Sequence, residues 1–388
     1  MSGDSYSEDN YSGDNYSGDN YSGTAQVNFT LEGGVSYLLR ATSQDAFATG
    51  SYELNVELEA PIAAQARQFS PVYGYGLVDA AAAVAQSIGR STFRDVANLG
   101  GRNWGLDMIQ APEVWAKGFT GKDIVVAVVD TGVDYTHIDL DDNIWVNEGE
   151  IFGNGIDDDR NGYVDDIIGW NFVDSDYNPM DLDSHGTHVA GIIAAERNRF
   201  GVTGVAYNAK IMPVRVLDEN GFGSYGDIAN GIIYAANNGA NVINLSLGGG
   251  YSAAIETAIQ YATQRGAIVV MAAGNSGEAE PSYPAHLATD YGIAVGAIDR
   301  GYDMADFSNQ AGQDSAMRYV VAPGVDILST VPGDGYESLN GTSMAAPYVA
   351  GVAALMLSAN PDLTPNQVRQ IITDRQQRKR RKKAGSPG

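Results

Sequence analysis

Hydrophobic and polar positions alternate along most of the chain in a way that predicts regular secondary structure. From about residue 104 onward, short apolar runs alternate with amphipathic stretches. The run at 124–129, IVVAVV, is apolar at every position, as expected of a strand buried on both faces of a sheet. Further strands are predicted at 211–217, 242–247, 267–272 and 293–297, and helices at 228–237, 253–265 and 365–373. The pattern predicts an α/β fold with a doubly wound, mostly parallel sheet flanked by helices.

The chain ends differ from this central region, which we place at 100–374. Residues 1–23 repeat the sequence Tyr-Ser-Gly-Asp-Asn and are predicted to be disordered. Residues 24–60 alternate apolar and polar positions, which predicts a short β-rich appendage. Residues 61–99 contain a strand-like YGYGLVD at 73–79, an Ala-rich helix at 80–86 and a polar linker. Residues 375–388 carry a basic run and are predicted to be a disordered tail, with binding to a polyanion or a surface as the alternative.

The composition narrows the possible partners. The chain has 48 Asp and Glu against 23 Lys and Arg, a net charge of −25, and no cysteine. Such acidity argues against nucleic acid as a partner and suggests that carboxylates bind cations, while the lack of cysteine excludes disulfides. We see no apolar run of membrane-span length and no secretory signal within residues 1–25. We expect a monomer.

A candidate nucleophile lies near the C-terminus. Residues 341–347 read GTSMAAP and precede a small, apolar stretch, which predicts a tight turn that opens a buried helix. Ser343 would then lie at the helix N-terminus, where free backbone N–H groups can receive an oxyanion. A lone serine at such a position is usually only a helix cap. The catalytic interpretation therefore depends on partners elsewhere.

Two such partners occur upstream. Asp130 follows the buried run at 124–129, at the carboxyl end where open α/β sheets build their sites. His185 lies in the segment DSHGTHVAG at 183–191. With Ser343, these motifs occur in the order Asp, His, Ser, and together they resemble the subtilisin-like serine proteases over about residues 103–373. A zinc site at His185 and His188 is not favoured, because Gly186 stands where a zinc protease has Glu.

The resemblance implies a mechanism and a fold of the subtilisin type. His185 would take the proton of Ser343, and Asp130 would orient and stabilise the imidazole. Asn275, in the segment MAAGNSG at 271–277, would supply the second oxyanion donor. The implied activity is that of a serine endopeptidase, which acts on proteins or peptides through an acyl-enzyme intermediate. A catalytically silent, calcium-binding scaffold is the alternative, whereas an esterase of the G-x-S-x-G type is disfavoured because Ser343 lies in GTSMA.

The same resemblance implies a substrate groove with two backbone edges and a side-chain pocket. One edge is Gly223, Ser224 and Tyr225, the other is Ser246, Leu247 and Gly248, and the pocket has Ala272, Ala273 and Gly274 as walls and Ser282 as floor. The pocket suits a large apolar side chain, but Glu278 and Glu280 could recruit a basic one. Ala346 and Tyr348 depart from the usual family residues without removing a catalytic group.

Calcium is the expected cofactor. Residues 157–166, DDDRNGYVDD, place oxygen side chains at alternate positions like an EF-hand loop, although Ile168 stands where the closing Glu would be. We therefore expect a calcium-binding insertion with Asp157, Asp159, Asn161 and Asp165 as ligands, and a merely acidic surface loop is the alternative. Asp139 and Asn198 match ligands of a second calcium site in many subtilases. The resemblance also implies an extracellular or periplasmic location, and residues 24–60 resemble pre-peptidase C-terminal modules of secreted proteases.

One element of the family is out of place. After the helix at 365–373, family members continue into a Gly-x-Gly-Leu-Val-Asn/Asp-Ala element, but here the basic tail follows. A matching segment, YGYGLVDAAAA, stands instead at residues 73–83. We expect this segment to pack on the peptidase domain, as in a circular permutation. The alternative is an upstream vestige without contacts.

Overall fold

Seven parallel strands form the centre of the computed structural model, which describes residues 69–374. The strands are β1 (Val125–Asp130), β2 (Trp170–Asn171), β3 (Lys210–Arg215), β4 (Val242–Leu245), β5 (Ile268–Ala272), β6 (Ile293–Ile298) and β7 (Tyr319–Pro323). Their order is β2-β3-β1-β4-β5-β6-β7, and all neighbouring pairs are parallel. The predicted α/β fold with a mostly parallel sheet is confirmed. The strand order reverses direction at β1, which makes the carboxyl ends of β1 and β4 the expected place for a site.

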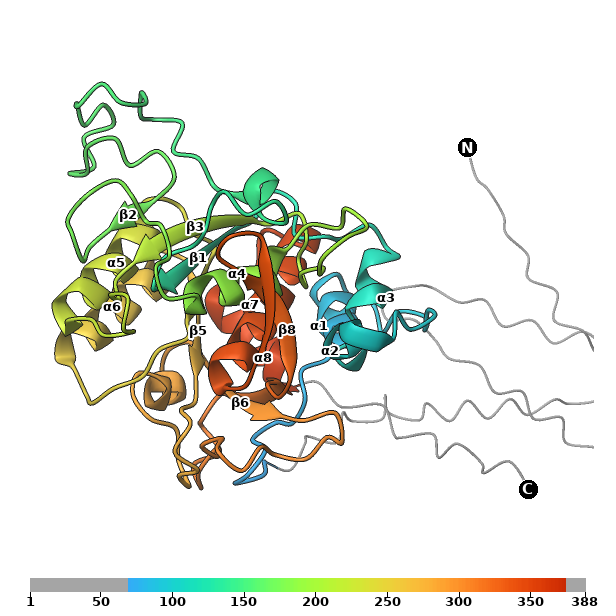
Figure 1. Ribbon diagram of the computed structural model, residues 1–388. Helices are drawn as coiled ribbons and strands as arrows, with labels where there is room; N and C mark the ends of the chain where they lie inside the picture. Colours follow the sequence, from blue (N-terminus) through green and yellow to red (C-terminus); the bar gives the residue numbers. More distant parts are fainter. Residues whose placement is uncertain (1–68, 375–388) are drawn as a thin grey trace, which may run out of the picture. The chain divides into compact units, whose positions relative to one another are not determined.

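Helices cover both faces of this sheet (Figure 1). The α-helices are α1 (Ala80–Ser87), α2 (Trp104–Met108), α3 (Ala111–Trp115), α4 (His185–Ala194), α5 (Tyr225–Asn237), α6 (Ala253–Gln264), α7 (Thr342–Ala359) and α8 (Pro365–Asp374). Three 3-10 helices, η1 (Gly101–Asn103), η2 (Asp141–Asn143) and η3 (Ala285–Thr289), lie in the connections. The pair α5 and α6 covers one face, and α4 and α7 cover the other. The helices predicted at 228–237, 253–265 and 365–373 are therefore confirmed.

Helix α7 is long, apolar and mostly buried against the sheet. It is 18 residues long with a mean hydropathy of 1.4, so our expectation that no segment has the length and composition of a membrane span was wrong for this helix. However, 83% of it is buried inside the domain, where it contacts β4 to β7. Pro347 cannot donate a backbone hydrogen bond to the carbonyl of Ser343, and the hydroxyl of Ser246 donates to that carbonyl instead, at 2.8 Å. This exchange fixes the start of α7 against the end of β4.

A two-stranded antiparallel hairpin, β8 (Ile327–Val331) and β9 (Gly335–Leu339), packs on α4 and was not predicted from the sequence. The Nε2 atom of His188 contacts the carbonyl oxygens of Ile327 and Glu337 at 3.0 and 3.1 Å. Burial lowers the pKa of His188 to about 4, so its imidazole is neutral at pH 7. His188 thus joins α4 to the hairpin.

The segment before α1 lies beside the last strand of the sheet. Leu77 forms a parallel bridge with Val321 of β7, and the N–H of Val78 donates to the carbonyl of Val321 at 3.0 Å. Gly74 has φ +54°, and a Cβ there would come within 2.4 Å of the carbonyl oxygen of Tyr319, so only glycine fits this close approach. Asp79 caps α1 by accepting from the N–H of Ala82 at 2.8 Å. The segment therefore extends the sheet past β7.

Helix α1 then packs on α7, α3 and α8. Its residues are almost entirely buried, including Ala81, Val84 and Ala85 at 0% exposure. The described residues belong to one compact unit. Our predictions for residues 1–23, 24–60 and 375–388, and for the first residues of the 61–99 region, lie outside the described residues.

Candidate active site

Asp130 and His185 form the centre of the candidate site. Asp130 is the last residue of β1 and is fully buried, and His185 is the first residue of α4. The Nδ1 atom of His185 lies 2.7 Å from Oδ1 of Asp130, which also accepts from the N–H of Thr131 at 2.8 Å. A Cβ on Gly186 would come within 2.0 Å of the carbonyl oxygen of Gly132, so glycine lets α4 begin this close to β1. The imidazole is therefore held with Nε2 free for another partner.

Several negative charges act on this imidazole. Burial by itself lowers the pKa of His185, but the charge and the hydrogen bond of Asp130 raise it, and the charges of Asp183 and Asp181 add to that effect. The net result is a pKa above the ordinary histidine value. Such a pair suits a base that becomes a stabilised imidazolium during a reaction.

Ser343 lies in the first turn of α7, which packs against α4. Its hydroxyl donates to the carbonyl of Ser246 at 3.2 Å. No hydrogen bond joins Ser343 to His185 within residues 69–374 of the structure. Catalytic hydrogen bonds are often loose before substrate binds, and a rotation about χ1 is all that redirects a serine hydroxyl. The structure thus places Ser343 beside the end of β4, next to the strand that carries Asp130.

Asn275 directly follows the β5 end of the sheet and is fixed against the start of α7. Its Oδ1 accepts from both the N–H and the hydroxyl of Thr342, each at 2.9 Å. The hydroxyl oxygen of Thr342 in turn accepts from the N–H of Gly274 at 3.1 Å. Because the amide oxygen is occupied, the Nδ2 group is the one left to donate beside Ser343. An oxyanion hole requires a free donor of this kind.

The two predicted substrate edges lie on either side of a cavity. Tyr225, Leu247 and Gly248 line it, as does Gly249, the next glycine of the same edge. The lining also includes residues that sequence reasoning missed: Ile228, Gly250, Ser252, Ile255, Tyr283, Pro284 and Leu287. The hydroxyl of Tyr225 accepts from the N–H of Gly250 at 2.9 Å, which joins one edge to the other. Gly223 has a different reason to be glycine, since a Cβ there would come within 2.2 Å of the carbonyl oxygen of Val216.

The residues of the predicted side-chain pocket also lie near one another. Ser282 donates its N–H to the carbonyl of Ala273 at 2.9 Å, which brings the floor residue beside the wall formed by Ala272, Ala273 and Gly274. The hydroxyl of Ser282 accepts from Nδ2 of Asn309 at 2.8 Å. Asn309 carries no motif that would mark it in the sequence, and only the packing of the fold brings it here.

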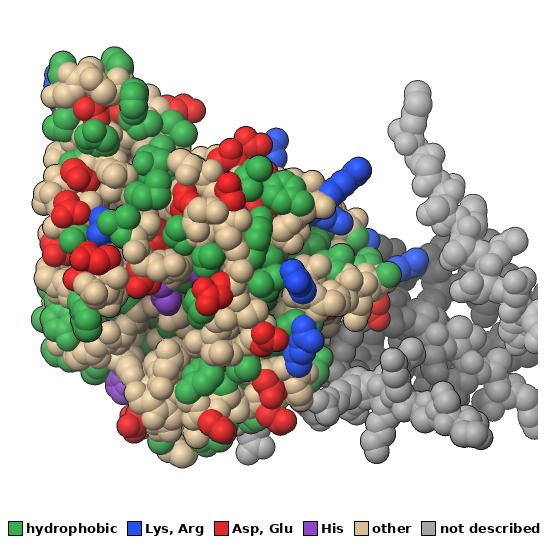
Figure 2. Space-filling model, in the orientation of Figure 1, with side chains coloured by type: hydrophobic (Ala, Val, Ile, Leu, Met, Phe, Trp, Pro, Cys, Tyr) green, Lys and Arg blue, Asp and Glu red, His purple; other side chains and the backbone are tan. Residues whose placement is uncertain are grey.

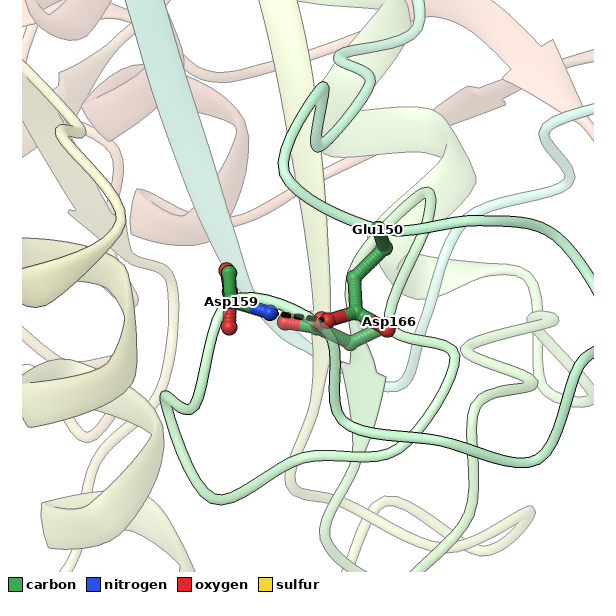
Figure 3. A group of neighbouring side chains, drawn as sticks. All are labelled: Glu150, Asp159 and Asp166. Atoms are coloured by element: carbon green, nitrogen blue, oxygen red, sulfur yellow. Dashed lines mark hydrogen bonds between the residues drawn. The ribbon is translucent and has the colours of Figure 1, made fainter.

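An acidic loop between β1 and α4 projects from the domain (Figure 1, in green). Carboxylate oxygens of Glu150, Asp159 and Asp166 lie within 4.8 Å of one another (Figure 3). Burial raises the pKa of Asp166 to about 6, although Tyr234, Asn161 and Asn147 donate to it. Three carboxylates this close repel one another unless protons or a cation are present, and oxygen donors of this kind suit Ca²⁺.

The predicted calcium ligands of this loop do not all lie together in the structure. Only Asp159 belongs to the convergent group. Asp157 accepts from the N–H groups of residues 161 and 162, and Asp165 accepts from those of residues 154 and 155. Asn161 donates its side-chain amide to Asp159 and Asp166. Glu150 and Asp166 were missed, because Glu150 lies outside the motif and Asp166 occupies a position next to the expected ligand.

Asp139 and Asn198 lie together, as the resemblance implied. The side-chain N–H of Asn198 donates to Asp139 at 2.9 Å, and the N–H of Val202 donates to the second carboxylate oxygen, also at 2.9 Å. Asp139 is fully buried, and this burial raises its pKa.

On the face drawn in Figure 2, acidic side chains are spread widely and do not gather in one patch.

The chain is similar to many known proteins. A model described as "Subtilase family" matches residues 121–386. A "Thermophilic serine proteinase" of Bacillus sp. (strain AK1) is 48% identical over 244 residues, which cover 62% of this chain and 53% of that protein. "Subtilisin Savinase" of Lederbergia lenta is 45% identical over 268 residues, 69% of this chain and 88% of that protein.

A solved structure gives the same result. It is described as a cold adapted subtilisin-like serine proteinase, is 36% identical and superposes with a TM-score of 0.53 over 65% of this chain and 81% of that chain. The chain spans 53% to 62% of the length of several of its curated relatives. On the basis of the family match, the relatives and the fold, this chain belongs to the subtilase family.

Proposed function

We propose that this chain is a serine endopeptidase that cleaves proteins or peptides at a site built from Asp130, His185, Ser343 and Asn275. The observation that carries the proposal is the 2.7 Å contact between the buried Asp130 and His185, with Ser343 at the start of a helix that packs against α4. His185 takes the proton of Ser343 as the hydroxyl attacks the scissile carbonyl. The N–H of Ser343 and the Nδ2 group of Asn275 stabilise the oxyanion.

The following steps use the same groups. The imidazolium of His185, stabilised by Asp130, gives its proton to the leaving amine and leaves an acyl-enzyme on Ser343. Water then loses a proton to His185 and attacks the acyl group, and His185 returns that proton to the Ser343 oxygen as the acid is released. Labelling of Ser343 by a fluorophosphonate probe, together with cleavage of casein, tests the proposal. Absence of both would favour the alternative, a catalytically silent scaffold.

The substitution Asp183→Asn should move the acid limb of the activity profile to lower pH. His185 must be neutral to accept the Ser343 proton, so activity is lost as the pH falls through a pKa that nearby carboxylates raise. Removing the charge of Asp183 lowers that pKa, and the variant stays active at lower pH. The measurement is kcat/KM from pH 4 to 9. Asp362→Asn, at a position just past the far end of α7, is the control. An acid limb at the same pH in both variants would contradict the electrostatic account.

We also propose that calcium stabilises the fold. Glu150, Asp159 and Asp166 supply three convergent carboxylates, which fits the oxygen ligands that Ca²⁺ requires, while Asp157 and Asp165 shape the loop. Asp139 and Asn198 supply oxygen atoms for a second ion. Calcium at these positions would clamp a chain that has no cysteine, and it takes no part in the chemical steps.

Chelation with EGTA should lower the melting temperature by about 4 °C. A ligand present at about one hundred times its dissociation constant stabilises a fold by about 2.7 kcal/mol, and removing it returns that amount. The variant Asp159→Asn should already melt lower and should lose part of the response to EGTA, whereas Asp157→Asn should keep that response. Equal melting curves of the unmodified protein with and without EGTA would rule calcium out.

The folded catalytic domain, in this proposal, extends from Ser70 to Asp374 and includes the segment at 70–87. Its support is the hydrogen bonding of Tyr75, Gly76 and Val78 to β7 and the packing of α1 on α7.

We further propose an extracellular or periplasmic location, because a fold stabilised by bound calcium suits a calcium-rich exterior.

A further inference from the structure

Asn309 lies between β6 and β7 and is fully buried beneath the loop that follows β5. Its side-chain oxygen accepts from the N–H groups of Ser276 and Glu278, each at 3.0 Å. Its side-chain nitrogen donates to the hydroxyl of Ser282 at 2.8 Å. A single amide group therefore holds the loop on one side and the pocket floor on the other.

The backbone of Asn309 tightens the same contact. Its N–H donates to the carbonyl of Gly274 at 2.9 Å, and its carbonyl accepts from the hydroxyl of the buried Tyr319 at 2.7 Å. A Cβ on Gly274, whose φ is +107°, would lie 2.6 Å from both Nδ2 of Asn309 and Oγ of Ser282. Asn309 is thus anchored to β7 and packs directly under Gly274.

These contacts enclose Asn275, whose two sequence neighbours, Gly274 and Ser276, are both hydrogen-bonded to Asn309. Within residues 69–374, the Asn275 side chain is hydrogen-bonded only to Thr342, through its oxygen. The direction in which its Nδ2 group points therefore depends on the position of the loop. Asn309 holds that position together with two backbone hydrogen bonds, from the N–H of Gly277 to the carbonyl of Phe307 and from the N–H of Gln310 to the carbonyl of Glu278.

We propose that Asn309 is a positioning residue of the active site: it holds residues 274–278 and Ser282 as one unit, and so aims Asn275 at the oxyanion and fixes the pocket floor. This inference rests on the proposed endopeptidase function. The two halves of the Asn309 amide have separable effects. The oxygen acts on the loop and hence on kcat, and the nitrogen acts on Ser282 and hence on the side chain that the pocket accepts.

The substitution Asn309→Ala should lower kcat about 10- to 100-fold for every peptide substrate, with a smaller change in KM. Two buried N–H groups lose their acceptor, and a displacement of about 1 Å at a catalytic donor can cost about 100-fold. Ser282→Ala removes only the contact to the side-chain nitrogen. It should change the relative KM values across peptides with Ala, Leu, Phe or Lys before the scissile bond by more than it changes kcat.

Ser308→Ala is the matched control for a general loss of stability. Ser308 is buried beside Asn309, and its hydroxyl accepts from the N–H of Ala297 and donates to the carbonyl of Asn309. This variant should melt at a lower temperature with an unchanged kcat. Asn309→Asp keeps an oxygen toward both loop amides and an acceptor toward the Ser282 hydroxyl, so it should recover most of the kcat that alanine loses.

The outcomes separate the two claims. If the unmodified protein neither hydrolyses peptides nor reacts with the fluorophosphonate probe, the endopeptidase proposal fails. If the unmodified protein is active but Asn309→Ala retains its kcat, or loses no more than Ser308→Ala does, the role of Asn309 is refuted. Should Asn309→Ala not fold, Asn309→Ser takes its place, because it retains an acceptor for one amide, and wild-type kcat in that variant refutes the role equally.

Discussion

The substitution Ser343→Ala should lower the rate of peptide hydrolysis by about 10⁴- to 10⁶-fold, the scale on which loss of a triad residue lowers catalysis in subtilisin. The hydroxyl is the only group lost, and its hydrogen bond to the carbonyl of Ser246 is long at 3.2 Å. The fold should therefore persist with an unchanged melting temperature. Steady-state hydrolysis of a chromogenic peptide measures the loss of activity. Labelling by a fluorophosphonate measures the loss of the nucleophile.

Ser358→Ala is a suitable control, because Ser358 lies near the opposite end of the same helix and accepts from the N–H of Gly121. It should retain full hydrolysis and full labelling. Undiminished hydrolysis in Ser343→Ala would place the nucleophile elsewhere. Loss of the fold in Ser343→Ala, in contrast, would show that the hydroxyl holds β4 and α7 together.

Removing residues 1–88 should leave a chain that does not fold stably and has no activity. The deletion exposes the edge of β7 and the apolar faces of α7 and α8 that contact α1. It also removes eight apolar side chains, each at most 7% exposed: Leu77, Val78, Ala80, Ala81, Ala82, Ala83, Val84 and Ala85. At about 1.5–3 kcal/mol for each large side chain such as Leu or Val, the loss is comparable with the 5–15 kcal/mol by which most domains are stable. Circular dichroism melting and probe labelling provide the measurement.

A permuted chain supplies the matching control. Residues 70–88 can be joined after residue 374 by a short flexible linker, with the new chain starting at residue 89. Arg318 contacts both places, since it donates to the hydroxyl of Thr373 at 3.0 Å and stacks over the Tyr75 ring at 5.8 Å. The permuted chain should fold and label, whereas the same chain with Leu77→Asp and Val78→Asp should not. A stable, active protein lacking the segment altogether would contradict the proposal.

The hydrophobic pattern predicted those strands and helices whose side chains are determined by burial alone. The strand at β1 was predictable because both faces are covered, so that every position from 124 to 129 must be apolar. Asp130 was predictable because it interrupts that run at the strand end. The same reasoning could not predict β8 and β9, since their side chains alternate only weakly and hold to α4 through single polar contacts such as that of Thr330 with the carbonyl of Thr187.

Contacts between side chains that the fold brings together from distant parts of the sequence were not predictable. Glu150 meets Asp159 and Asp166 across a loop whose path depends on backbone amides, and no spacing rule encodes that path. Asn309 contacts Ser276 across 33 residues of sequence. The apolar length of α7 was overlooked in the sequence, and its composition has a related cause: a helix buried within a protein has the composition of one buried in lipid.

The bridge between Leu77 and Val321 has a consequence for how the domain folds. These partners are 244 positions apart, so the edge of the sheet cannot close until almost the whole domain has been synthesised. The apolar face of α1 must meanwhile stay without its partners, which slows folding and favours aggregation of the partly made chain. In the folded domain, the segment at 70–87 contacts β7 and α7 near the other end of the chain. A single protease cut in the connection at 88–100 would then leave two fragments that stay associated, and native mass spectrometry would detect them as one species.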